Sequence, residues 1–308
     1  MDNSLKASIE ALIRAKRGFE FEALISEIHL IQYGSDGFQP TRERKDDGAE
    51  GIILSSKTVI AAYGPDAYDE KRFLKKVNDD FDDFLNKWAA ENPNWKMHYN
   101  GSLAPEQIRI SETLKSKAAS KQITVNIILV KGVDQIMQLV EEEFSNKQQR
   151  QLATYLGVAK ELIIFDHIRS IIDDLIRGIE IDPENIRYDL KIDIEEKINL
   201  NYTPEDAILA SEEYQDFVVN GTLKKIWGIL STYENEEINS LKMRIKREFN
   251  NLTGTFKDKL NRLTESYLNK YSSGQDDDFE YFTRALLVYS FEQCMIGDKI
   301  KSEEKQAP

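Results

Sequence analysis

The densest group of charged side chains lies just before an apolar run, in the segment Arg42-Glu-Arg-Lys-Asp46-Asp47-Gly48-Ala49-Glu50-Gly51. Glu50 stands between two glycines, which let a backbone or a ligand approach closely, where a strand is expected to begin. Two or three carboxylates that meet there can hold Mg²⁺, which takes a few oxygen ligands and keeps several waters. Such a metal polarises a phosphodiester and activates water, and a nearby lysine stabilises the transition-state charge. The alternative interpretation is a charged surface turn.

The spacing of apolar residues predicts the elements around this segment. Residues 3–32 have helical periodicity, and Gly18 either kinks or divides the helix. Residues 51–54 and 58–63 are apolar runs joined by a short polar turn, which predicts a β-hairpin. The further expected elements are a helix over 67–90, a strand over 95–99, a helix or loop over 103–119, a strand over 123–130 that is buried on both faces, and a helix over 133–144.

The second half of the chain is predominantly helical in its periodicity. More helix is expected over 146–178, and the alternation of apolar residues between Pro183 and residue 204 is consistent with a strand. The later candidate helices span residues 211–230, 235–252, 256–271 and 279–296. These patterns predict an α/β domain over residues 1–180 and an all-α domain over residues 181–308.

The composition excludes several classes of protein. A chain of 308 residues with one Cys has no intramolecular disulfide framework and no Cys-rich zinc site. It contains no apolar run long enough for a transmembrane helix, and its first residues lack the apolar core of a secretory signal, so the expected location is the cytoplasm, with no membrane partner. The net charge of −13 opposes coating of nucleic acid by charge alone but permits a local basic surface.

The order of elements around the acidic segment carries a resemblance to a known family. A helix with Glu20 and Glu22 comes first, the hairpin with Glu50 follows, and a lysine-bearing helix comes next. This αβββαβ order resembles the core of the restriction-endonuclease-like, or PD-(D/E)XK, nucleases, over residues 19–130. Within it, Asp46-x-Gly48-x-Glu50-Gly51 resembles the D-x-G-x-D-G turn of the Mrr-like branch. The resemblance implies an α/β (α+β) restriction-endonuclease-like core, followed here by the all-α C-terminal domain.

The same resemblance implies roles for individual residues. Most family members carry the second acid and the lysine on the next strand as (D/E)-x-K, whereas this strand reads Val59-Ile-Ala-Ala-Tyr63, followed by Gly-Pro. Some bacterial defence-associated members end the strand in a similar Tyr-x-Pro and place the lysine on the following helix. Lys75 or Lys76 would then be the catalytic lysine, with Asp79 or Asp80 one turn later. Glu50 would be the main ligand of Mg²⁺ or Mn²⁺, helped by Glu22 or Glu20, while Asp46 shapes the turn and is a further candidate ligand.

Two basic clusters flank the expected site. They consist of Arg42, Arg44 and Lys45 before the hairpin, and of Lys71, Arg72, Lys75 and Lys76 on the next helix. Either they are solvated surface, or they contact DNA phosphates, which supply affinity without sequence information.

The last helix carries a second resemblance. The segment from Ala285 to Gly297 is similar to the C-terminal segment of proteins from bacterial ABC-three-component (ABC-3C) antiphage defence systems. The resemblance implies a partner protein such as an ABC or SMC-like ATPase. The chain itself has neither a P-loop nor a G-x-G-x-x-G motif, so an ATPase would be a separate protein.

The leading hypothesis is an antiphage-defence effector nuclease that hydrolyses DNA with a divalent metal and is regulated by a partner or by self-association. The rival hypothesis is a catalytically inactive nuclease-fold adaptor or DNA-binding subunit of a defence ATPase complex. A helical scaffold, stabilised by its α/β half, is a third. Among the remaining residues, His29, His167 and Cys294 are expected in packed or surface positions, and His98 is a candidate at the edge of the cleft.

Overall fold

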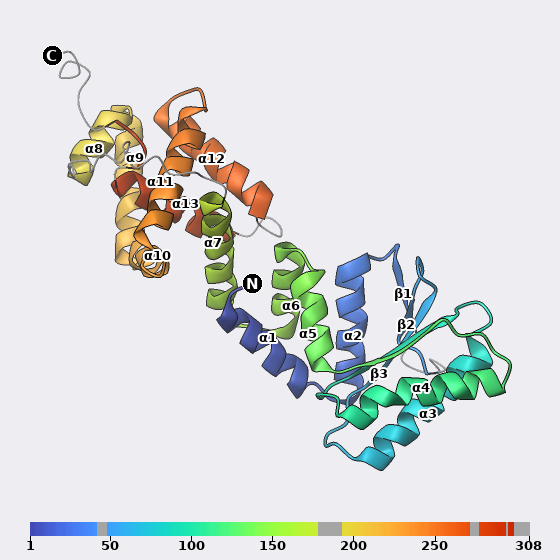
Figure 1. Ribbon diagram of the computed structural model, residues 1–308. Helices are drawn as coiled ribbons and strands as arrows, with labels where there is room; N and C mark the ends of the chain where they lie inside the picture. Colours follow the sequence, from blue (N-terminus) through green and yellow to red (C-terminus); the bar gives the residue numbers. More distant parts are fainter. Residues whose placement is uncertain (42–47, 178–192, 272–276, 294, 299–308) are drawn as a thin grey trace. The chain divides into compact units, whose positions relative to one another are not determined.

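The computed structural model describes residues 1–41, 48–177, 193–271, 277–293 and 295–298 (Figure 1). The chain divides into two compact units, Met1–Ala159 and Lys160–Pro308. The protein is mixed α/β, with a five-stranded mixed sheet in the first unit. Among the described residues, none of the helices combines the length and apolar character that a membrane span requires.

The first unit is built around this sheet. Its elements in chain order are α1 (Asn3–Ala15), α2 (Gly18–Tyr33), β1 (Phe38–Pro40), β2 (Gly51–Ile53), β3 (Thr58–Tyr63), α3 (Glu70–Lys87), β4 (Asn94–Tyr99), α4 (Pro105–Ser120), β5 (Ile127–Lys131), α5 (Val133–Glu142) and α6 (Asn146–Leu156). The strands follow the order β1-β2-β3-β4-β5. The first two pairings are antiparallel and the last two are parallel, so the expected hairpin of β2 and β3 is confirmed.

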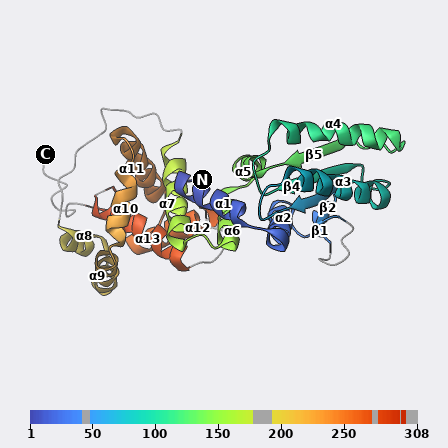
Figure 2. The same cartoon turned by 90° about the horizontal axis from the view of Figure 1, so that it is seen from below.

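Helices cover both faces of the sheet. On one face, Val59, Ala61 and Trp95 of the strands pack against Val77 of α3 and Leu114 of α4 in one apolar cluster. Helix α4 runs along β5 (Figure 2). On the other face, α2 contacts β1, β2 and β3, and α5 contacts β4 and β5. Helices α1 and α6 pack against this second helical layer. The result is a three-layer arrangement in which α2 and α3 lie on opposite faces of the sheet.

The chain between α1 and α2 explains how α2 is placed. Gly18 has φ +46°, a backbone conformation that L side chains rarely adopt, and it divides the expected long helix in two. Its N–H donates to the carbonyl oxygen of Gly64 at 2.6 Å. The side chain of Asn100 donates to the carbonyl oxygens of Lys16 and Pro65. The start of α2 is thereby tied to the ends of β3 and β4.

Three sequence expectations for this unit need correction or completion. The strand expected over residues 123–130, buried on both faces, is β5 at Ile127–Lys131, with Ile127 and Leu129 exposed. This strand is the edge of the sheet. Its side chains alternate between the two faces, so Ile128 and Val130 pack in the cluster with α4, whereas Ile127 and Leu129 do not. The segment over 103–119 is a helix, α4, and β1 is a further short strand before the acidic segment.

In the second unit, every element of the described residues is a helix. These are α7 (Lys160–Ile176), α8 (Ile194–Asn201), α9 (Pro204–Val219), α10 (Thr222–Leu230), α11 (Asn235–Asn250), α12 (Phe256–Tyr271) and α13 (Asp277–Glu292). Their shared core includes Ile168, Leu241, Ile245, Leu260 and Leu286. Left-handed glycines divide two of the expected long helices, Gly157 (φ +77°) between α6 and α7 and Gly221 (φ +67°) between α9 and α10.

The division between the units lies ahead of the boundary expected at residue 180. Helix α7 packs against α11, α12 and α13, and its apolar side chains belong to the helical core. It therefore belongs to the second unit rather than to the α/β unit. The boundary expected from the sequence lies in residues 178–192, outside the described residues. The strand considered between Pro183 and residue 204 lies partly there, and its described part is helical instead, because it forms α8 and the start of α9.

Candidate functional site

Backbone hydrogen bonds hold Glu50 between two strands, at the start of β2. Its N–H donates to the carbonyl oxygen of Ile60 at 2.7 Å, and its carbonyl oxygen accepts from the N–H of Thr41 at 3.0 Å. A Cβ on Gly51 would lie 2.3 Å from the ring of Phe38, so only glycine fits there. Ala49 is fully buried in the apolar cluster under α3. Because both neighbours of Glu50 are fixed, its backbone position is well determined.

Helix α2 places a second acid beside Glu50. Glu22 and Glu50 line one cavity of about 290 Å³, and Ser26, one turn after Glu22, donates to the carbonyl oxygen of Glu50 at 3.5 Å. The hydroxyl of Thr41 donates to the carbonyl oxygen of Ala49. The full lining is Phe19, Glu22, Ala23, Ser26, Glu27, Leu30, Pro40, Thr41, Glu50 and Tyr155. The helical residues recur three or four positions apart, which places them on one face of α2.

Lys76 of α3 lies within electrostatic reach of both acids. Its Nζ pairs with Oδ1 of the buried Asp80 at 2.8 Å. Burial acts to lower the pKa of Lys76, but the carboxylates of Asp80, Glu50 and Glu22 overcome that effect and raise the pKa above its ordinary value. Lys76 is therefore held as a cation near Glu22 and Glu50, two of the acids that line the cavity.

The structure distinguishes the two candidate lysines. The side chain of Lys75 is 77% exposed and pairs with Asp79 at 2.6 Å, whereas that of Lys76 is 38% exposed. Successive residues on a helix point about 100° apart, so only one of the two can face the acids. That residue is Lys76.

The remaining candidates are distributed as follows. Glu20 does not line the cavity; it is exposed and pairs with Lys16 at 3.4 Å, so Glu22 is the acid of α2 that accompanies Glu50. Lys71 and Arg72 are exposed in the first turn of α3. Arg42, Arg44, Lys45 and Asp46 lie outside the described residues.

The donor set at the cavity contains only oxygen atoms. Glu22, Glu27 and Glu50 contribute carboxylates, and Ser26, Thr41 and Tyr155 contribute hydroxyls. Among the described residues, no group of three or more His, Cys, Asp and Glu side chains is placed to hold a metal ion. Mg²⁺ is commonly bound through one or two carboxylates and retains several waters, so the chemistry of this donor set fits that ion.

Sequence reasoning did not identify two aromatic residues of the cavity. Phe19 lies in the first turn of α2, and Tyr155 lies in α6, far away along the chain. Both are exposed. No local pattern links them to the acidic segment, because only the packing of α6 against α2 brings Tyr155 to the cavity.

His29 of α2 and His98 of β4 form a buried pair between the helix and the sheet. Their Nε2 atoms lie 3.2 Å apart, and neither histidine lines the cavity. Burial and the nearby Lys96 lower the pKa of His29 to about 4. Burial, His29 and the lysines at 131 and 96 hold the pKa of His98 well below its ordinary value. The pair packs α2 against the sheet in its neutral form. His167, in the second unit, is also buried and contacts the hydroxyl of Thr283 at 3.0 Å.

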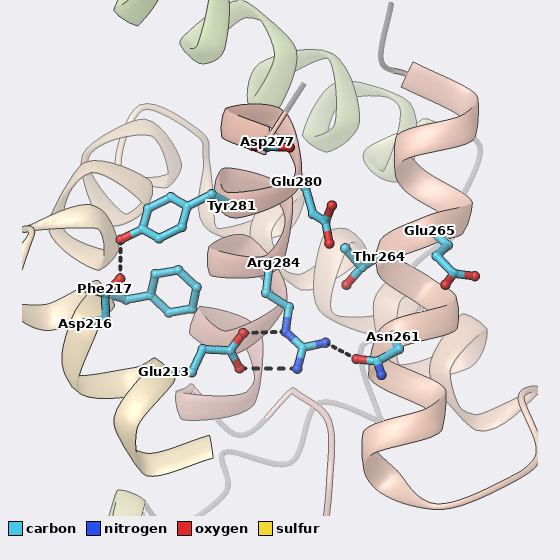
Figure 3. A pocket seen from close by; sticks show the side chains of 10 residues that line it. All are labelled: Glu213, Asp216, Phe217, Asn261, Thr264, Glu265, Asp277, Glu280, Tyr281 and Arg284. Atoms are coloured by element: carbon cyan, nitrogen blue, oxygen red, sulfur yellow. Dashed lines mark hydrogen bonds and ion pairs between the residues drawn. The ribbon is translucent and has the colours of Figure 1, made fainter. Parts of the chain in front are cut away.

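A larger cavity, of about 520 Å³, lies in the helical unit between α9, α12 and α13 (Figure 3). Arg284 donates to both carboxylate oxygens of Glu213, at 2.9 and 3.2 Å, and to the amide oxygen of Asn261 at 2.7 Å. Tyr281 donates to Asp216 at 2.8 Å. These bonds join side chains of all three helices.

Comparison with known proteins adds no relative. The chain matches no protein-family model, no curated protein and no solved structure.

Proposed function

We propose that the first unit is a metal-dependent DNA endonuclease domain with a restriction-endonuclease-like core. The observation that carries the proposal is that Glu50 and Glu22, from two different parts of the chain, line one cavity, while Lys76 of α3 lies within electrostatic reach of both. The succession α2-β1-β2-β3-α3-β4 supports the same proposal, because it has the element order of that nuclease core.

Each side chain has a chemical role in this proposal. Glu22 and Glu50 hold Mg²⁺ or Mn²⁺. When bound, the metal supplies Lewis-acid polarisation of the phosphodiester and activation of water. The ammonium of Lys76 stabilises the negative charge that develops on the phosphate oxygens during hydrolysis. Asp80 holds that ammonium at 2.8 Å from a buried position, so it acts as a positioning residue.

The apolar character of β3 is consistent with a lysine on the helix. Val59, Ile60, Ala61 and Ala62 are all buried, since both faces of this central strand are covered. A charged pair on the strand would have to be desolvated there. Lys76 and Asp80 instead approach from α3, where the lysine keeps part of its solvent contact.

Binding to DNA is proposed to depend on a partner. Lys71 and Arg72 are exposed at the start of α3 and are available to contact phosphates. The net charge of −13 opposes tight unaided binding. The sequence resemblances favour a role in antiphage defence. The proposed partner is an ABC or SMC-like ATPase, and the chain is proposed to self-associate.

In the helical unit, exposed side chains rather than the C-terminal motif offer a surface for that partner. Ala285, Leu286, Leu287 and Val288 of the motif lie in the core of the unit. The exposed apolar side chains of this unit gather on α9 and α10, namely Ile208, Leu209, Val218, Val219 and Trp227. Where exposed apolar residues form a contiguous patch, the patch commonly marks a protein interaction site, so these residues are the candidates for contact with the partner.

Cleavage of supercoiled plasmid tests the proposal. In the presence of Mg²⁺ or Mn²⁺, and with any co-purifying partner, Glu50→Gln should reduce nicking by at least about 100-fold, because it removes a metal-binding charge without changing side-chain size. Glu20→Gln is the matched control and should cut like the wild type, because Glu20 does not line the cavity.

Two outcomes would contradict this assignment. Equal cutting by Glu50→Gln and wild type would show that the site is wrong. If the wild type never cuts, with or without the partner, the inactive adaptor or DNA-binding subunit replaces the nuclease.

A further inference from the structure

The exposure of Phe19 is unusual within this protein. All fourteen phenylalanines of the chain lie in the described residues, and Phe19 alone is exposed, at 75%. Leaving a large apolar ring in water forgoes the stabilisation of roughly 1.5–3 kcal/mol that burial would bring. The residue is also placed at a specific point, because it lines the same cavity as Glu22 and Glu50.

Tyr155 gives the cavity a second aromatic wall. Its side chain is 46% exposed and belongs to α6, which follows α2 by more than a hundred residues in the sequence. Burial and the nearby Glu27 and Glu20 raise the pKa of Tyr155, so its phenol is neutral at physiological pH. Two exposed aromatic rings therefore border one cavity that also contains the proposed catalytic acids.

The charge of the lining indicates the kind of group that occupies the space between the rings. Glu22, Glu27 and Glu50 line the cavity, and among the described residues no lysine or arginine does. A second phosphate would be repelled by these carboxylates, whereas an uncharged planar ring would not. At about 290 Å³ the cavity is at the lower end of the range for small organic ligands, roughly 300–1,000 Å³.

We infer that Phe19 and Tyr155 stack on an unpaired nucleobase next to the phosphodiester that is cut, so that the substrate is single-stranded or locally unpaired DNA. This inference rests on the proposed nuclease function. A base inside a duplex has both faces covered by its neighbours, and only an unpaired base can present a face to an aromatic side chain. Stacking of this kind tolerates any base sequence, so it sets the strandedness of the substrate rather than its sequence.

Binding without cleavage tests the inference separately from the catalytic proposal. The probe is a short single-stranded oligonucleotide that carries 2-aminopurine, measured with the full chain in Ca²⁺ or in EDTA. Stacking quenches 2-aminopurine fluorescence, and the wild type should bind this probe more tightly than a blunt duplex of the same sequence. Phe19→Ala and Tyr155→Ala should each weaken binding by roughly 5- to 150-fold and reduce the quenching.

Two further variants control for indirect effects. Phe19→Trp retains an aromatic face and should keep both affinity and quenching. Tyr33→Ala removes an exposed aromatic side chain that does not line this cavity, and it should bind like the wild type.

The outcomes separate the two proposals. If Phe19→Ala and Tyr155→Ala bind and quench like the wild type, or if the blunt duplex binds as tightly as the single strand, the inference is overturned. Loss of cutting in Glu50→Gln would still uphold the nuclease in that case. If the aromatic variants lose binding but no protein cuts, the base-binding site stands and the catalytic proposal fails.

Discussion

The cavity of the α/β unit and the cavity of the helical unit both contain carboxylates beside a cation, but the cations are engaged differently. In the helical unit, Nε, Nη1 and Nη2 of Arg284 all donate to Glu213 or Asn261, so this guanidinium joins three helices. In the α/β unit, Lys76 pairs with Asp80 and also lies within the field of Glu22 and Glu50.

The difference shows that cavity size is a poor guide to chemistry here. The larger cavity is lined by a bidentate arginine–carboxylate pair, in which each of the two groups already satisfies the other. The smaller cavity is lined by acids and by two exposed aromatic rings, and Lys76 lies within the electrostatic reach of Glu22 and Glu50, a combination that resembles a substrate site.

The strongest test of this comparison is the pair of adjacent lysines. Lys76→Gln keeps a group that can donate to Asp80 but removes the positive charge, so cleavage should fall by about 100-fold or more. Lys75→Gln makes the same change on the exposed face of α3 and should leave cleavage unchanged. The measurement is the initial rate of plasmid nicking, with circular dichroism to show that both variants are folded. Equal loss in the two variants would mean that α3 acts only through its surface charge.

The second test uses pH, because among the described residues only the α/β unit contains a buried histidine pair. The folded-state pKa of His29 is about 4, below the ordinary value of 6.5. The unfolded chain therefore binds more protons between these values, and stability falls as the pH drops from 6.5 towards 4. A shift of this size corresponds to roughly 3 kcal/mol of unfolding free energy.

His29→Gln should flatten that dependence, because glutamine does not titrate. The measurement is the urea midpoint of the α/β unit at pH 7.5, 5.5 and 4.5, compared as the difference between variant and wild type. If the wild type and the variant lose the same stability as the pH falls below 6.5, protonation of His29 is not the cause of that loss.

The smallest expected effect concerns the helical cavity. Arg284→Met leaves Glu213 and Asn261 without their shared donor and should lower the free energy of unfolding by about 1–2 kcal/mol. Plasmid cleavage and oligonucleotide binding by the folded variant should not change. A loss of either, at unchanged stability, would assign the helical cavity a direct part in the function and remove the contrast between the two cavities.

Local patterns in the sequence determined much of the α/β unit. The hairpin of β2 and β3 follows from two short apolar runs with a polar turn between them, and α3 follows from apolar residues at helical spacing. The glycine at position 18 marked the division between α1 and α2, since a left-handed backbone angle is needed there. The acidic candidates Glu22 and Glu50 could also be predicted from the sequence, because they lie in or next to these local elements.

Other features were decided only by tertiary structure. Periodicity predicts that a helix has an apolar face, but it does not tell which polar neighbour lies at the edge of that face, so Lys75 and Lys76 could not be separated. The exposure of β5 depends on its place at the edge of the sheet, and the domain boundary depends on the partners of α7.

The candidate site shows the same division. The position of Glu50 at the start of a strand is a local property. Glu22, Lys76 and Tyr155 come near it only because α2, α3 and α6 pack against the sheet or against each other. The sequence by itself determined the elements and the chemical groups they carry, because hydrogen bonding and side-chain periodicity act over a few residues. Only the tertiary structure decided which of those groups meet, because burial of apolar faces acts between residues that are far apart along the chain.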